Sequence, residues 1–195
     1  SMEVEVKPLV LGKPITTYAS FSKLNDAAAL ISKSEYPLIL AGNGVIRDNA
    51  SDALIEFATR LNIPVVNTFM GKGAIPYTHP LSLWTTGLQK RDVVSCCFDR
   101  ADVVIAVGYD LVEYSPKKWN PDGTIPIVHV SLTESETDSS YVPKVDVVGN
   151  ISDSLVEILR RADRRTKNDD FISQVRSQLS ENYENYARDE GFPVK

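Results

Sequence analysis

Short, unbroken runs of apolar residues alternate along this chain with segments whose apolar residues recur at helical spacing. The runs are 37–41 (PLILA), 64–68 (PVVNT), 102–107 (DVVIAV), 126–130 (PIVHV) and 145–148 (VDVV). A continuous apolar run of this length predicts a strand that is buried on both faces. Each run stops at a turn signal, so the strands are short and separate.

Helices are predicted where apolar residues lie three and four positions apart. One begins with Ser22 as its N-cap, one spans 49–61, a short one spans 92–100, and one begins with Ser152 as its N-cap. Buried strands that alternate with amphipathic helices predict a doubly wound α/β fold. We therefore expect a mostly parallel, Rossmann-like sheet of about six strands with helices on both faces.

Composition divides the chain into three parts. Ser1 is typical of the residue that remains after a tag is cleaved, and Met2 of a start methionine. Residues 1–21 are therefore predicted to be a tag remnant followed by an extended linker. Residues 22–162 form the predicted central α/β domain. Residues 163–195 are strongly charged, with a further helix over 171–187, and predict a helical connector toward a missing C-terminal domain.

Charge and cysteine content exclude several classes of protein. The net charge is −5 and no segment concentrates basic residues, so no nucleic-acid partner is expected. No apolar run approaches the roughly 20 residues of a membrane span, so no membrane partner is expected either. The two cysteines, Cys96 and Cys97, are adjacent and suit packing on a helix in a reducing, cytoplasmic compartment.

Glycine-rich turns follow three of the predicted strands. Ligands of doubly wound sheets bind at the carboxyl ends of the strands. The candidate cofactor-binding residues are therefore Gly42, Asn43, Gly44, Gly71, Lys72, Gly73, Gly108, Tyr109 and Asp110. For the first turn a tight strand-to-helix connection, with Gly44 at positive φ, and a phosphate site near the helix start at Asn49 are both open. Lys72 is expected to be solvated.

No catalytic or metal site is predicted within this chain. Arg47 stands where a dinucleotide fingerprint has its third glycine, and Thr68 where it has an acidic residue, which argues against a nicotinamide site. His79 is expected in a turn and His129 in the core. Neither has Asp, Glu or Cys residues nearby in sequence at the spacing of metal ligands. No nucleophile motif is present.

Four further stretches carry recognisable motifs: 37–45 (PLILAGNGV), 62–68 (NIPVVNT), 67–82 (NTFMGKGAIPYTHPLS) and 100–108 (RADVVIAVG). Together they resemble the central domain of acetolactate-synthase-type thiamine-diphosphate enzymes, in that family's order and spacing, over residues 22–162. The resemblance implies a fragment that is catalytically inactive by itself and a parent that condenses pyruvate with a 2-keto acid and releases CO₂.

Two departures from that pattern bear on flavin. Flavin-containing members have an Arg-Phe-Asp-Asp-Arg motif after the Ala-Val-Gly strand, whereas this chain has YDLVEY at 109–114, with Trp119-Asn120 soon after. Their Gly-Met-Leu-Gly-Met-His-Gly run is replaced by WTTGLQ at 84–89. Both departures resemble the catabolic, flavin-independent branch and argue against FAD.

The resemblance also implies cofactors and partners for the parent. Thiamine diphosphate and Mg²⁺ are expected on flanking pyrimidine- and diphosphate-binding domains of the same polypeptide, and the parent is expected to be a homo-oligomer. The chain has one Asp-Gly pair, Asp122-Gly123, in a predicted turn rather than in the family's Gly-Asp-Gly motif. Two alternatives stay open: a nucleotide- or FAD-binding module of the same fold, and another thiamine-dependent 2-keto-acid decarboxylase or carboligase.

Overall fold

Six parallel strands form one twisted sheet at the centre of the molecule. The computed structural model describes residues 17–87, 94–163 and 169–188. The strand order is β3-β2-β1-β4-β5-β6, and every neighbouring pair is parallel. The strands are β1 (Pro37–Ala41), β2 (Val65–Asn67), β3 (Ser82–Thr85), β4 (Val103–Val107), β5 (Ile127–Ser131) and β6 (Val145–Val148). The predicted fold class is confirmed.

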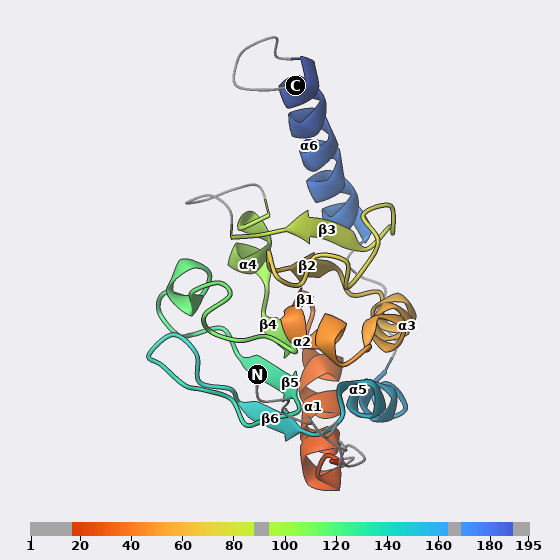
Figure 1. Cartoon of the computed structure of the whole chain (residues 1–195), viewed down its shortest axis with the longest axis vertical. Coiled ribbons are helices and arrows are strands. Elements are labelled where there is room, and N and C mark those ends of the chain that lie inside the picture. Colours follow the sequence, from red (N-terminus) through yellow and green to blue (C-terminus); the bar gives the residue numbers. More distant parts are fainter. Residues whose placement is uncertain (1–16, 88–93, 164–168, 189–195) are drawn as a thin grey trace, which may run out of the picture.

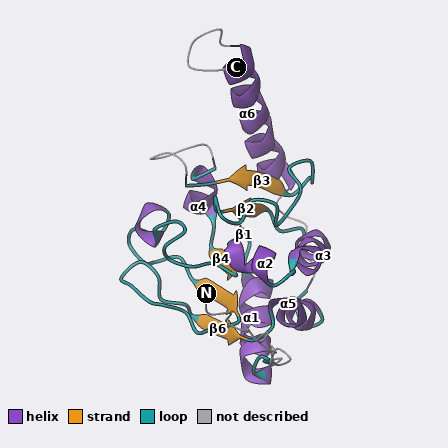
Figure 2. Cartoon of the chain, viewed as in Figure 1, coloured by secondary structure: helices purple, strands orange, loops and turns teal. Residues whose placement is uncertain are grey.

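Helices and long loops cover opposite sides of this sheet (Figure 1). Helices α1 (Phe21–Lys33), α3 (Ser51–Leu61) and α5 (Ile151–Leu159) lie together on one side. Helix α4 (Cys96–Arg100), the 3₁₀ helix η1 (Pro116–Lys118) and the connections between β4, β5 and β6 lie on the other (Figure 2). Both faces of the sheet are therefore covered, as expected of a doubly wound fold.

The strands are buried because their side chains are apolar on both faces. All five residues of β1, of β4 and of β5 are buried. Leu54 and Phe57 of α3 and Leu155 of α5 are fully buried against them. Burying each of these side chains contributes roughly 1.5–3 kcal/mol to the free energy of unfolding. The apolar runs that predicted the strands therefore also provide the surface on which the helices pack.

The sixth strand lies in a segment that the apolar pattern leaves without structure. Strand β3 reads SLWT, with a polar residue at each end, and only its first two residues are buried. It is a strand because it pairs with β2 at the edge of the sheet and is covered by helix α6 (Asp169–Arg188). Tertiary pairing therefore decides this element.

Three predicted helix starts are wrong. The N-caps are Ser20 and Asn150, not Ser22 and Ser152, and Asn150 Oδ1 accepts a hydrogen bond of 3.0 Å from the amide of Asp153. The helix predicted over 49–61 is α3, which begins at Ser51, and a separate short helix, α2 (Asn43–Arg47), precedes it. Asn49 lies between them at φ 52°, so no helix starts there to hold a phosphate.

Some predictions at the ends of elements fall partly outside the described residues. Of the helix predicted over 92–100, residues 92 and 93 are not described, and α4 begins at Cys96. Cys97 is buried in α4 and Cys96 is exposed. Residues 1–16 of the predicted linker are likewise outside the description.

Helix α6 packs on the β3 edge instead of extending freely along its whole length. Ile172, Val175 and Leu179 are buried, and Arg176 donates two hydrogen bonds of 2.8 Å to the carbonyl oxygens of His79 and Ser82. The helix predicted over 171–187 is confirmed, while its role as a connector stays a prediction.

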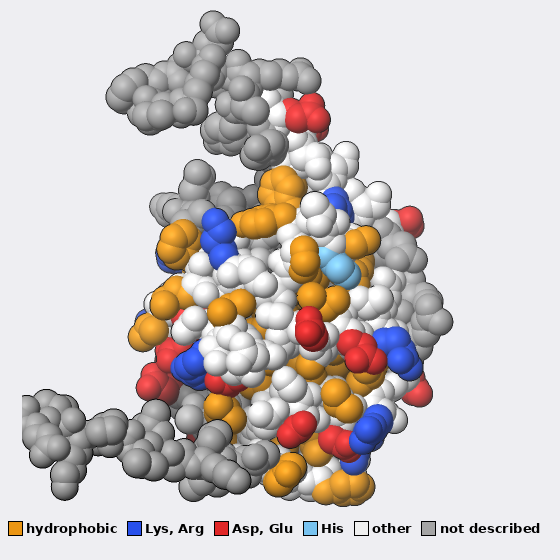
Figure 3. Space-filling view, turned by 45° about the vertical axis from the view of Figure 1, so that its right-hand side comes forward, with side chains coloured by type: hydrophobic (Ala, Val, Ile, Leu, Met, Phe, Trp, Pro, Cys, Tyr) orange, Lys and Arg blue, Asp and Glu red, His pale blue; other side chains and the backbone are white. Residues whose placement is uncertain are grey.

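Charged side chains are dispersed on the surface. On the face shown in Figure 3, described Lys and Arg residues lie singly or in small groups among Asp and Glu, without a continuous basic area. Within the described residues, no helix combines the length and apolar character that crossing a membrane requires.

Candidate functional site

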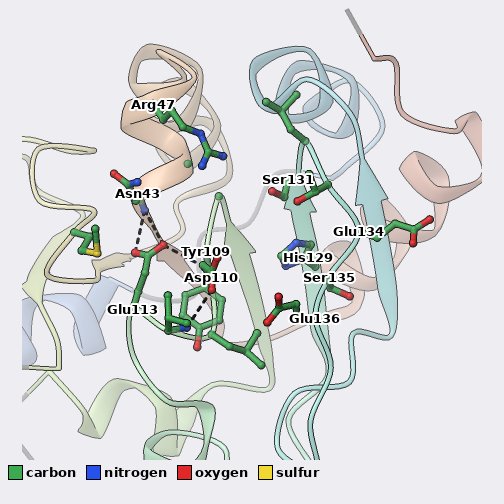
Figure 4. Close-up of a pocket in the computed structure, with 17 residues that line it drawn as sticks. Asn43, Arg47, Tyr109, Asp110, Glu113, His129, Ser131, Glu134, Ser135 and Glu136 are labelled. Carbon is green, nitrogen blue, oxygen red and sulfur yellow. Dashed lines mark hydrogen bonds between the residues drawn. The ribbon is translucent and has the colours of Figure 1, made fainter. Parts of the chain in front are cut away.

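A cavity of about 570 Å³ opens at the carboxyl ends of β1, β4 and β5. Strands β1 and β4 are neighbours in the sheet. The strands that follow β1 in sequence lie on one side of this pair, and those that follow β4 lie on the other. Doubly wound folds bind their ligands at such a reversal of strand order. The lining comes from the turn after β1, residues 108–113 after β4 and residues 131–136 after β5, together with Arg47, Met70 and His129 (Figure 4).

The structure brings five of the nine predicted ligand-facing residues together in this cavity. Asn43, Gly44, Gly108, Tyr109 and Asp110 line it. All five follow β1 or β4, so the cavity opens at the edge of the sheet where ligands of doubly wound folds bind.

The other four residues do not line the cavity. Gly42 lies behind the lining, where a Cβ atom would come 2.9 Å from the Glu113 carboxylate. Gly71 packs against the backbone of Ala41. Gly73 is exposed, and Lys72 is exposed with its Nζ 5.8 Å from the ring centre of Phe69, which agrees with a solvated lysine.

Two glycine turns close the junction between β1 and β4. The amide of Gly42 donates to Val107 O at 2.9 Å, and that of Gly44 donates to Gly108 O at 2.8 Å. The expectation of positive φ at Gly44 is wrong, because Gly108, at φ 57°, is the left-handed residue of the pair. Gly44 is instead required by the close approach of the two backbones.

The carboxylate of Glu113 binds the remaining backbone donors at these strand ends. It accepts hydrogen bonds from the amide of Asn43 at 3.0 and 3.1 Å, from the amide of Asp110 at 3.2 Å and from Thr68 Oγ1 at 2.5 Å. Thr68 Oγ1 in turn accepts from the amide of Gly71 at 2.9 Å. One side chain thus connects the ends of β1, β2 and β4.

Aromatic rings pack beneath the loop that carries Glu113. Tyr109, Trp119 and Tyr141 are buried, with ring centres 5.4 to 6.3 Å apart. Tyr109 donates a hydrogen bond of 2.5 Å to Tyr114 O, and burial raises its pKa far above the ordinary value for a phenol. These rings hold the 109–115 loop in place and have no ionised form to offer a ligand near neutral pH.

His129 reaches the cavity from β5 with 3% of its surface exposed. Its Nδ1 lies 2.6 Å from the hydroxyl of Tyr141, which has no other hydrogen-bond partner among the described residues. A ring that accepts this hydrogen bond at Nδ1 carries its proton on Nε2, and a ring that donates it carries the proton on Nδ1. Burial lowers the pKa of His129, and the charges of Asp146 and Asp110 partly oppose this shift.

Acidic groups outnumber basic ones around the cavity. Asp110, Glu113, Glu134 and Glu136 line it, against the single guanidinium of Arg47. Within the described ranges no three His, Cys, Asp or Glu side chains gather in a group that could hold a metal ion. The wall therefore carries excess negative charge, which disfavours a diphosphate that enters without a cation.

Sequence reasoning did not select Arg47, His129 or the 131–136 segment as part of the site. A usable signal existed for Ser131, because it directly follows the predicted strand 126–130, just as Gly42 and Gly108 follow theirs. Glu113 lies six residues beyond β4, and nothing in its spacing indicates that its carboxylate returns to the end of β1.

Comparison with known proteins gives a consistent result. The family model described as thiamine pyrophosphate enzyme, central domain, matches residues 24–158. A probable acetolactate synthase large subunit of Methanocaldococcus jannaschii is 33% identical over 156 residues, covering 78% of this chain and 25% of that protein. An acetolactate synthase of Bacillus subtilis is 27% identical, covering 72% of this chain and 25% of its own length.

A relative named for a different reaction matches as well. It is a 3D-(3,5/4)-trihydroxycyclohexane-1,2-dione hydrolase of Geobacillus thermodenitrificans, 27% identical over 83% of this chain and 24% of its own length. The chain spans about a quarter of the length of the curated relatives it matches.

Proposed function

This chain belongs to the family of thiamine pyrophosphate enzyme central domains, and from that premise we propose that it is the structural, interface-forming domain of a longer acetolactate synthase-like enzyme. The observation that carries the proposal is the extent of the match. Residues 24–158 include all six strands of the sheet and nearly all of α5, so the domain is shared as a unit.

The parent enzyme would decarboxylate pyruvate and join the resulting two-carbon unit to a second 2-keto acid. Thiamine diphosphate supplies the carbanion chemistry of such reactions when bound, and the protein supplies orientation. The cofactor and Mg²⁺ would be held by flanking pyrimidine- and diphosphate-binding domains in a cytoplasmic homo-oligomer. The match is to the central domain of these enzymes alone, which supports placing the cofactor outside this chain.

The role of this chain in such a parent is to provide surfaces on which the flanking domains pack. Four exposed apolar side chains lie on or next to the loops at the carboxyl edge of the sheet: Ile46, Phe69, Met70 and Tyr77. We infer that they pack against the flanking domains.

Activity measurements on two proteins test the proposal. The 195-residue chain with pyruvate, thiamine diphosphate and Mg²⁺ should form no acetolactate. The full polypeptide that contains this chain should form it only when both cofactors are present. Acetolactate production by the homogeneous 195-residue chain, or none by the cofactor-loaded full polypeptide, would refute the proposal.

A nucleotide-binding module is the second candidate, favoured by the position of the cavity at the β1–β4 junction. Glu113 and the acidic lining oppose a dinucleotide, and we therefore propose that FAD is not retained. The full polypeptide should be colourless after purification. Stoichiometric flavin absorbance would favour the module instead. A different thiamine-dependent carboligase would be recognised by turnover of other 2-keto acids but not pyruvate.

A further inference from the structure

The donors at the ends of β1, β2 and β4 form a small, converging group. The amides of Asn43 and Asp110 and the hydroxyl of Thr68 come from three different segments and all point at one carboxylate. The neighbouring amides of Gly42 and Gly44 are bonded to strand β4 and the residue after it. These five donors are therefore satisfied within the chain.

The group that satisfies the converging donors is itself an anion. Charged acceptors form stronger hydrogen bonds with backbone amides than neutral ones do, and oriented amides favour negative charge. Glu113 arrives from a loop 70 residues away in sequence from Asn43, and Figure 4 shows its carboxylate between Asn43 and Asp110. A phosphate oxygen entering the cavity would need the same donors and would meet the same negative charge.

We propose that Glu113 is the specificity-determining residue of this cavity: its carboxylate occupies the place of a ligand phosphate and so excludes phosphate-bearing ligands. The exclusion has two parts. The donors are occupied, and the remaining wall carries Asp110 and Glu136 with only Arg47 in opposition. The inference concerns the cavity alone and holds whatever reaction the parent catalyses.

Inorganic pyrophosphate is the probe that tests this, without divalent metal, on the ¹⁵N-labelled 195-residue chain. In the Glu113→Ala protein, the amide resonances of Asn43 and Asp110 should shift saturably with added pyrophosphate. Affinity should rise by about tenfold or more over the wild type, since donors to a charged acceptor become available. The wild-type resonances should not move at the same concentrations.

Glu136→Gln is the matched control, because it removes one negative charge from the same cavity. Glu136 is exposed and makes no hydrogen bond or ion pair with any other described residue. If it gains pyrophosphate binding equally with Glu113→Ala, general charge and not Glu113 excludes the ligand, and the proposal is wrong. Pyrophosphate binding to the wild type at these two amides overturns it as well.

Glu113→Gln covers the case in which the alanine protein does not fold. Glutamine keeps the length of the side chain and one acceptor oxygen but lacks the charge. A folded Glu113→Gln protein should respond to pyrophosphate at Asn43 and Asp110, more weakly than the alanine protein. If the folded glutamine protein leaves both resonances unmoved, Glu113 does not determine the specificity of the cavity.

Discussion

Gly44 approaches Gly108 so closely that a Cβ atom on Gly44 would lie 2.6 Å from the Cα of Gly108. The approach is reciprocal, since a Cβ atom on Gly108 would lie 2.7 Å from the Cα of Gly44. Both contacts are with backbone, which cannot move aside as the end of a flexible side chain can. The junction between β1 and β4 is therefore built for two residues without side chains.

A side chain at position 44 should destabilise the protein. We expect Gly44→Val to lower the free energy of unfolding by about 1–3 kcal/mol or more, because the backbones must separate. Thermal melts followed by circular dichroism measure the loss. Lys72→Ala is the control and should stay within about ±0.5 kcal/mol, since its side chain is solvated. An unchanged Gly44→Val melt would show that the junction can open at no cost.

Asp102 should stabilise the turn between α1 and β1. Its carboxylate accepts hydrogen bonds from the amides of Glu35 and Tyr36, at 2.7 and 3.0 Å, and from the hydroxyl of Ser34. Asp102→Ala removes these acceptors and should cost about 1 kcal/mol, as the loss of a helix cap does. That corresponds to a drop in melting temperature of roughly 2–4 °C.

Asp26→Ala provides the comparison for Asp102. Asp26 is an exposed carboxylate on α1 without a hydrogen bond or ion pair among the described residues, so its removal should change the melting temperature little. Equal losses from the two substitutions would mean that net charge, and not the turn, is responsible.

Stability should fall as the pH falls below about 6.5, in part because of His129. The unfolded chain protonates this residue near its ordinary pKa, whereas burial lowers the pKa in the folded protein. The contribution of His129 to the free energy of unfolding is therefore complete above the ordinary pKa of histidine and is lost as the pH falls below it. His129→Gln should narrow the difference between melting temperatures at pH 7.5 and 5.5. His79→Gln should narrow it less, because that ring is only half-buried.

Arg176 should fix α6 to the edge of the sheet. Without its guanidinium the carbonyl oxygens of His79 and Ser82 lose their shared donor. Arg176→Ala should speed amide hydrogen exchange in α6 while leaving β1 and β4 protected. Gln178→Ala, an exposed position on the same helix, should not. Uniform acceleration in all elements would instead indicate global destabilisation.

Local pattern determined most of the sheet. The runs at 37–41 and 102–107 became β1 and β4 because an unbroken apolar segment has to be covered on both faces, and 145–148 became the edge strand β6. The same rule placed the glycine turns at the edge where the cavity lies. Apolar runs and glycine turns depend on residues that are close in sequence, so the pattern of apolar positions predicts them directly.

Tertiary structure decided the rest, because strand pairing and close contacts join segments that are separate in sequence. Strand β3 exists because β2 supplies its hydrogen bonds and α6 covers it, and α6 lies far from β3 in sequence. The glycine at position 44 was identified from sequence, but its reason was a contact with Gly108 and not its own φ. Glu113 reaches Asn43 because the 109–115 loop is held in place by buried aromatic rings. Sequence order carries no trace of contacts that form between segments 45 to 70 residues apart, and the chemistry of the cavity depends on those contacts.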